Sequence, residues 1–191
     1  MSFEIKIIEF LQSGRNAFFD TSFKMISAIG SVVGVFVISL LFLLKKRKVF
    51  FWYLLSYAIT AMVVWILKDQ IHRVRPYNFS DNIICIGGAS TDFSFPSGHS
   101  ACATAIAIFV GYSLFTYYKN TGIRIGIVLG CGLYVGLVGL SRMYLGMHYL
   151  TDVLAGIAIS AVFCILGIVL MKLYEKQKKV KNENKNAGKR S

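Results

Sequence analysis

Five stretches of this sequence are apolar over lengths that can cross a lipid bilayer, which leaves few folds open to the chain. They cover residues 23–44, 49–67, 100–118, 123–140 and 150–173. A helix needs about 20 apolar residues to span the ~30 Å hydrocarbon core. Because lipid offers the backbone no hydrogen-bonding partner, such segments cross it as helices. The sequence therefore predicts the all-α class, a polytopic membrane helical bundle whose domain covers residues 23–173 and has five clear transmembrane helices.

Composition and charge agree with a membrane protein. Charged residues make up 16% of the chain, against about a quarter in a typical soluble domain. The net charge of +12 comes from Lys and Arg in short runs between apolar stretches, as expected beside anionic lipid. No basic face with stacking aromatics emerges, so we expect no nucleic-acid partner. The four cysteines form no C-x-x-C pair, which indicates neither a metal site nor a disulfide framework.

The two ends of the chain differ from the apolar stretches. Residues 1–22 mix apolar and charged positions, which favours an amphipathic helix at the interface over a sixth, poorly hydrophobic span. Residues 174–191 are rich in Lys, Asn and Glu and are predicted to be a disordered cytoplasmic tail.

Small residues recur in the fourth stretch, where Gly122, Gly126 and Gly130, and again Gly132 and Gly136, are four residues apart. This spacing lets helix backbones approach closely. We favour packing within the chain over a dimer seam, and the oligomeric state stays open.

Basic residues also predict an orientation in the cell membrane, because they gather on the cytoplasmic side. They lie between the first two spans, between the third and fourth, and after the fifth: Lys45, Lys46, Arg47, Lys48, Lys119, Arg124, Lys176, Lys178, Lys179, Lys181, Lys185, Lys189 and Arg190. Most acids fall on the opposite side: Glu4, Glu9, Asp20, Asp69, Asp81, Asp92 and Asp152. A multi-pass protein with its amino terminus outside and its carboxyl terminus inside satisfies both distributions.

Three polar groups stand at the outer ends of these spans. The first is Lys68, followed seven residues later by Arg75-Pro76; this spacing could place both cations on one helix face, and Pro76 helps to end that helix. Taken alone, two cations that snorkel from a helix end would be ordinary.

The second group, Pro96-Ser97-Gly98-His99, directly precedes the third span. A proline, a small residue and the free N–H groups of a helix start make an anion site, and a histidine beside it can exchange protons. A simple helix cap with an interfacial histidine is the plainer interpretation.

The third group is Ser141-Arg142, then His148 and Asp152. His148 and Asp152 are four residues apart and are predicted to neighbour each other on one helix face. A carboxylate bonded to one imidazole nitrogen makes the other a better nucleophile. Such a pair can equally be a capping or packing feature.

Together, three cations, two histidines and a carboxylate on one side of the membrane argue for a shared site, since ionisable groups at this depth are costly. Phosphoryl transfer uses this set: cations and amides bind the phosphate oxygens, one histidine attacks phosphorus and the other protonates the leaving oxygen. The acids form no cluster of the kind that holds Mg²⁺, so we expect no cofactor.

On these motifs the chain resembles the type 2 phosphatidic acid phosphatases, membrane enzymes related to the vanadium haloperoxidases. The resemblance implies a lipid phosphatase. Lys68, Arg75 and Arg142 would bind phosphate with Ser97 and Gly98, His148 would be the nucleophile, Asp152 would orient it, and His99 would be the general acid. That family usually has six membrane helices, so the resemblance is least complete before residue 23.

Several alternatives remain at this point. A vanadium haloperoxidase would be soluble, a lipid phosphotransferase would pass the phosphoryl group to another acceptor, and a silent lipid-binding protein would have lost a ligand. The substrates we expect are undecaprenyl diphosphate, phosphatidylglycerophosphate or phosphatidate. Of the remaining polar residues, we expect His72 and Arg73 at the interface, and Asp81 and Asp92 solvated in the outer loop rather than selecting substrates.

Overall fold

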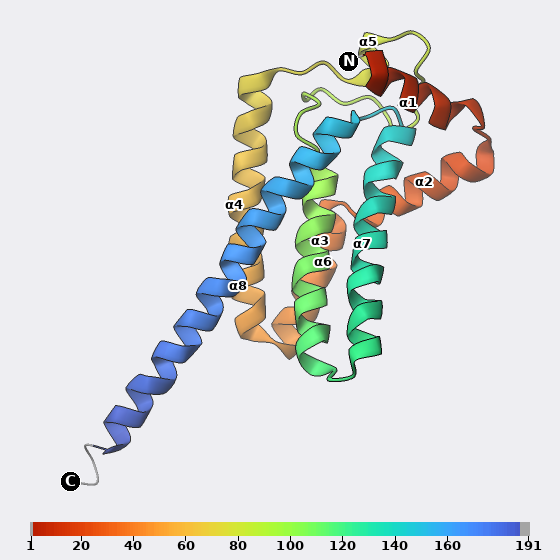
Figure 1. Cartoon of the computed structure of the whole chain (residues 1–191). Helices are drawn as coiled ribbons and strands as arrows, with labels where there is room; N and C mark the ends of the chain where they lie inside the picture. The colour runs from red at the N-terminus through yellow and green to blue at the C-terminus, as the bar shows by residue number, and fades with distance from the viewer. Residues whose placement is uncertain (1, 188–191) are drawn as a thin grey trace.

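The protein is a bundle of helices in the computed structural model, which describes residues 2–187 (Figure 1). The helices are α1 (Ser2–Ser13), α2 (Ala17–Ile29), α3 (Val32–Lys45), α4 (Arg47–Ile71), α5 (Pro76–Phe79), α6 (Gly98–Tyr117), α7 (Thr121–Tyr144) and α8 (Leu150–Ala187). The predicted all-α membrane bundle is confirmed.

Four of the five predicted spans are continuous helices long and apolar enough to cross a membrane, and they begin at Arg47, Gly98, Thr121 and Leu150. The first predicted span, 23–44, is not one straight helix. It corresponds to α2 and α3, which are bent by 45° at a short break and can form a fifth span only as a pair.

The break between α2 and α3 arises at Gly30 and Ser31. The Ser31 hydroxyl accepts a hydrogen bond from the backbone N–H of Val33 (3.2 Å) and so caps α3. A Cβ atom on residue 30 would lie only 2.4 Å from Cγ1 of Val138 on α7. Glycine therefore lets α2 press against α7, while α3 turns away to pack on α4 and α6.

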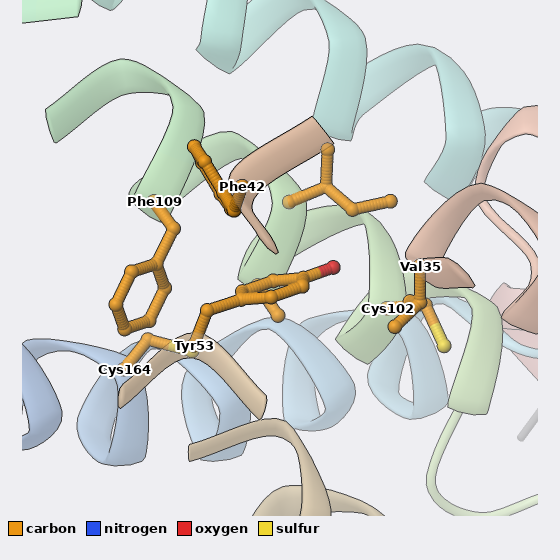
Figure 2. Close-up of a cluster of buried hydrophobic side chains, with 8 residues drawn as sticks. Val35, Phe42, Tyr53, Cys102, Phe109 and Cys164 are labelled. Atoms are coloured by element: carbon orange, nitrogen blue, oxygen red, sulfur yellow. The ribbon is translucent and has the colours of Figure 1, made fainter. Parts of the chain in front are cut away.

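Helix α6 occupies the middle of the bundle and packs against α8, α7, α4 and α3. The main apolar cluster joins four of these helices: Val35, Phe42, Tyr53, Cys102, Ala105, Ile106, Phe109 and Cys164 (Figure 2). The ring of Tyr53 meets those of Phe42 and Phe109 edge-on, at centroid distances of 5.6 and 5.3 Å. This apolar packing fixes the helices whose ends carry the predicted site.

The close helix contacts lie elsewhere than predicted. A Cβ atom on Gly126, Gly130, Gly132 or Gly136 would meet nothing within 4 Å, so these four glycines of α7 do not mediate close packing inside this chain. Gly156 of α8 does: a Cβ atom there would lie 2.3 Å from the carbonyl oxygen of Ser97. The start of α8 is therefore drawn against the start of α6.

The amino-terminal end agrees in part with expectation, whereas the carboxyl-terminal tail does not. Helix α1 has 12 residues, too few to cross the membrane, and buries Ile5 and Ile8 on one face, as an amphipathic helix does. Helix α1 ends at Ser13, and the predicted boundary of the amino-terminal segment at residue 22 falls inside the next helix, α2. The tail predicted to be disordered continues α8 as an exposed helix to Ala187, because extending an existing helix avoids the cost of nucleation. Residues 1 and 188–191, which belong to the predicted ends, lie outside the described residues.

Candidate active site

The three predicted groups meet at one end of the bundle, where α4 and α7 end and α6 and α8 begin (Figure 1). A polar cavity of about 310 Å³ opens there. Six predicted residues line it: Lys68, Arg75, Gly98, His99, Arg142 and His148. Met147 and residues 87–90 and 92 complete the lining. Ser97 and Asp152 are fully buried behind it.

Lys68 and Arg75 reach the cavity from different segments, so the predicted common helix face is wrong. Helix α4 ends at Ile71, and His72 has the left-handed conformation (φ 50°) that often terminates helices. Arg75 is extended and precedes Pro76, the first residue of α5. The proline disfavours helical geometry at Arg75 and so prevents one helix from carrying both cations.

Arg75 is almost completely buried and joins several parts of the site. Its Nη1 donates to the carbonyl oxygen of Met147 at 2.8 Å and lies 3.4 Å from Nε2 of His148. Its Nη2 pairs with the carboxylate of Asp92. The guanidinium thus stands directly beside the histidine nitrogen that faces the cavity.

Asp92 also pairs with Lys68 at 3.0 Å, so the expectation of a merely solvated loop acid is wrong for this residue. Burial acts to raise the pKa of Asp92, but hydrogen bonds from Ser90, Lys68 and Arg75 outweigh it and hold the pKa below its usual range. Asp92 is therefore ionised at neutral pH and engages two of the three predicted phosphate-binding cations.

Arg142, the third cation, lies buried in the last turn of α7. Its Nη1 donates to the hydroxyl of Ser27 on α2 at 2.6 Å. Its Nε has no hydrogen-bond partner within the described chain. An anion in the cavity would satisfy this donor, whose isolation is otherwise costly.

Helix α6 begins at the cavity, with Ser97 as its N-cap. The Ser97 hydroxyl accepts hydrogen bonds from the backbone N–H (3.4 Å) and the hydroxyl (2.9 Å) of Ser100. Gly98 and His99 then line the cavity. The N–H groups of a first helical turn have no helical partner and favour an anion.

His148 and Asp152 do lie together, but not on one helix face, because α8 begins only at Leu150. The Nδ1 atom of His148 is 3.5 Å from Oδ2 of Asp152, and its Nε2 atom is turned towards Arg75. Burial lowers the pKa of His148 to about 4, with Arg142 and Arg75 adding to the effect and Asp152 opposing it. The imidazole is therefore neutral at physiological pH.

Sequence reasoning missed two residues that hold Asp152. Ser94 donates its hydroxyl to Oδ2, which also accepts the N–H of Tyr149 at 2.9 Å. Arg73 donates from Nη1 to Oδ1 at 2.5 Å, so it does not simply face the interface as expected. The sequence indicated a role for Arg73 only through its place two residues before Arg75. No motif in the sequence pointed to Ser94.

The fold defines a multi-pass membrane protein, and its polar cavity offers the cations and N–H donors that an anion requires. Comparison with known families agrees with this class. The PAP2 superfamily model matches residues 49–176, which is more than half of the chain. The chain belongs to the PAP2 superfamily, as the resemblance of its motifs predicted.

Similar proteins in this superfamily are named as phosphatases. Phosphatidylglycerophosphatase B of Bacillus subtilis is 33% identical over 114 residues, which are 59% of this chain and 53% of that protein. An undecaprenyl-diphosphatase of Sulfolobus acidocaldarius is 27% identical over 82% of this chain and 72% of its own length. The first two curated relatives that the chain matches are covered over 53% and 43% of their length, so the chain spans about half of each.

A solved structure has a similar fold over most of both chains. The crystal structure of a transmembrane PAP2-type phosphatidylglycerolphosphate phosphatase from Bacillus subtilis matches with a TM-score of 0.76 and 25% identity. The match covers 92% of this chain and 86% of that one.

Proposed function

We propose that this chain is an integral membrane phosphatase that hydrolyses a lipid phosphate monoester or diphosphate through a phosphohistidine intermediate. The observation that carries the proposal is the junction of two cavities. The polar cavity shares Lys68, Asp92, Gly98 and His99 with an apolar cavity of about 270 Å³. A molecule with a phosphate at one end and a hydrocarbon chain beside it fits this pair.

The apolar cavity is formed mainly by α4, with contributions from α3 and α6. Its other lining residues are Val32, Tyr57, Thr60, Ala61, Val64, Trp65, Ala101 and Cys102. Trp65 is 69% exposed on the outside of the bundle, where a membrane helix meets lipid. A lipid chain that lay here would remain in apolar surroundings while its phosphate entered the polar cavity.

The geometry supports a two-step reaction. In the first step the neutral Nε2 of His148 attacks phosphorus, the bond from phosphorus to the leaving oxygen breaks, and His99 gives that oxygen a proton. In the second step water attacks the phosphohistidine, His99 takes up a proton from this water, and free phosphate and neutral His148 are formed. Arg75, Arg142 and the α6 amides stabilise the charge on the phosphate oxygens.

Purified protein should release phosphate from undecaprenyl diphosphate, phosphatidylglycerophosphate or phosphatidate in detergent, and should continue to do so in excess chelator. The reason is that three cations and the α6 amides supply the positive charge that a metal would otherwise bring. Orthovanadate should inhibit, because it resembles phosphate in shape and charge.

Phosphate release measured on the three lipids, with and without chelator, tests this proposal. No release from any of the lipids would overturn it, and strict dependence of the chemistry on added Mg²⁺ would overturn the metal-free mechanism. Transfer of label to an added alcohol or sugar instead of water would identify a phosphotransferase.

We further propose that the site faces the outside of the cell, because the basic ends of the spans lie at the opposite end of the bundle. In a background without native cysteines, Asp81→Cys in the outer loop should react with a membrane-impermeant thiol reagent in intact cells. Lys185→Cys near the end of α8 should react only after the cells are opened. Both positions are exposed, so accessibility within the protein does not bias the comparison. The reverse labelling pattern would refute the orientation.

A further inference from the structure

Helix α1 is fixed across the end of the bundle that carries the site (Figure 1). At its carboxyl end, the amide nitrogen of Gln12 donates to the carbonyl oxygens of Ile84 (2.9 Å) and Tyr144 (2.8 Å). The amide oxygen of Gln12 accepts the N–H of Ile84 at 2.9 Å. In the middle of α1, Ile5 and Ile8 are buried in a cluster with Tyr149, the residue just before α8. These contacts hold α1 in a single position relative to α8.

At its amino end, α1 presents Glu4 to the first residues of α8. Oε1 of Glu4 accepts hydrogen bonds from the backbone N–H (2.9 Å) and the hydroxyl (2.8 Å) of Thr151. Oε2 accepts a hydrogen bond from Nη2 of Arg73 at 2.8 Å. A carboxylate from a distant helix thus caps α8 and binds an arginine at the same time.

Arg73 connects Glu4 with Asp152. Its Nη1 donates to Oδ1 of Asp152 at 2.5 Å and to the hydroxyl of Thr151 at 2.6 Å. Its guanidinium carbon lies 3.9 Å above the centre of the Tyr149 ring. The planar group is therefore fixed by two carboxylates, a hydroxyl and an aromatic face, which suits arginine and not lysine.

These contacts help to fix how the carboxylate of Asp152 is turned. Arg73 binds Oδ1, while Oδ2, which also accepts hydrogen bonds from Ser94 and the N–H of Tyr149, faces Nδ1 of His148. The order from α1 to the histidine is a carboxylate, a guanidinium, a second carboxylate and an imidazole. These charges alternate in sign. Arg73 therefore weakens the attraction of Asp152 for a proton on His148, and Glu4 in turn weakens this effect of Arg73.

We propose that Glu4 and Arg73 are positioning residues of the reaction, which makes the N-terminal helix a part of the active site. This inference rests on the proposed function, in which His148 is the nucleophile and Asp152 orients it. Neither residue lines the polar cavity, so both act through Asp152 and not by touching the phosphate.

The inference predicts opposite changes in the titration of His148. Arg73→Gln removes a cation beside Asp152, which strengthens the pull of that carboxylate on a proton at His148. The titration should then move to higher pH. Glu4→Gln leaves the charge of Arg73 less offset, so the titration should move to lower pH. We expect shifts of about 0.5–1 pH unit, smaller than those from a direct neighbour.

The other charged and titratable groups around His148 are the same in all these variants. They are Asp152 on α8, Arg75 before α5, Arg142 on α7, His99 on α6, and Lys68 and Asp92 in the same cavity. A difference between variants therefore reports the altered residue.

NMR of the detergent-solubilised full chain labelled with ¹⁵N-histidine can measure the titration. The chain has three histidines, and the signal of His148 is the one that disappears in His148→Asn. Glu9→Gln is the matched control: Glu9 also lies on α1, but its carboxylate accepts a hydrogen bond from Asn82 (3.1 Å), away from Asp152. It should leave the titration unchanged. Arg73→Gln should also lower kcat by up to about 10²-fold with little change in KM, because Asp152 is misoriented.

Opposite shifts in the two variants support the inference, whereas no shift in either, or shifts in one direction, overturns it. If Arg73→Gln does not fold, Glu4→Gln decides alone, since it preserves the shape of the side chain. The titration needs no turnover, so it separates the two claims. An inactive wild type with shifting titrations would refute the proposed function only, and an active wild type with fixed titrations would refute this inference only.

Discussion

Replacing His148 with asparagine should reduce turnover of every phosphate substrate by roughly 10⁴-fold or more. The neutral Nε2 atom faces the cavity beside Arg75, 3.4 Å away, and it is the atom proposed to form the bond to phosphorus. Asparagine is polar and no larger than histidine, but its amide nitrogen cannot attack phosphorus. An acid-labile label acquired by the protein from a radioactive phosphate donor should disappear with the activity.

His72→Asn is the matched control for this experiment. His72 lies at the same end of the bundle, but its ring packs edge-on against Phe93 at 4.4 Å and does not line the polar cavity. Asparagine tolerates its left-handed backbone, so this variant should retain both activity and label. Persistent labelling of His148→Asn would show that another group is the nucleophile.

Replacing His99 with asparagine should slow hydrolysis of a lipid phosphate by roughly 10²–10⁴-fold, the usual cost of losing a general acid. Part of this loss should return with a nitrophenyl phosphate, because its leaving oxygen departs without needing a proton. His148→Asn should recover nothing with the same substrate, since a better leaving group cannot replace the attacking nitrogen.

The comparison of these two variants on the two substrates assigns the roles of the histidines. If His99→Asn were the variant that lost the phosphoprotein label, and His148→Asn the one rescued by nitrophenyl phosphate, the two roles would be reversed. Equal losses on both substrates would show that His99 binds or positions the phosphate and gives no proton to the leaving group.

Hydropathy was sufficient to predict most of the bundle, because the penalty for exposing polar backbone to lipid dominates every other local preference. It failed at Gly30 and Ser31, where two small residues interrupt an apolar stretch without changing its average hydropathy. The bend there depends on the approach of α2 to Val138, a contact between residues over a hundred positions apart. No local pattern encodes such a contact.

The candidate site was predictable to the extent that its residues lie in short motifs at helix ends. The cavity brings together the cations and histidines of all three motifs, although their chemical roles remain predictions. The partners of those residues were not foreseen. Asp92 and Arg73 carry ordinary charges in polar segments, and only the folded chain shows that one meets the cations and the other meets Asp152.

In the proposed mechanism, the pairing of Asp92 with Lys68 and Arg75 would make phosphate binding an exchange of one anion for another. An arriving phosphate would pair with those two cations only as it displaced the carboxylate of Asp92, so its net gain in free energy would be the difference between two similar interactions. Inorganic phosphate has little else to offer, whereas a lipid also places its chain in apolar surroundings. In the proposed reaction the same exchange would run in reverse after hydrolysis, when the returning carboxylate would compete with free phosphate and favour its departure. If the proposed function holds, a single acid on the loop before α6 would thus discriminate against the reaction's own product.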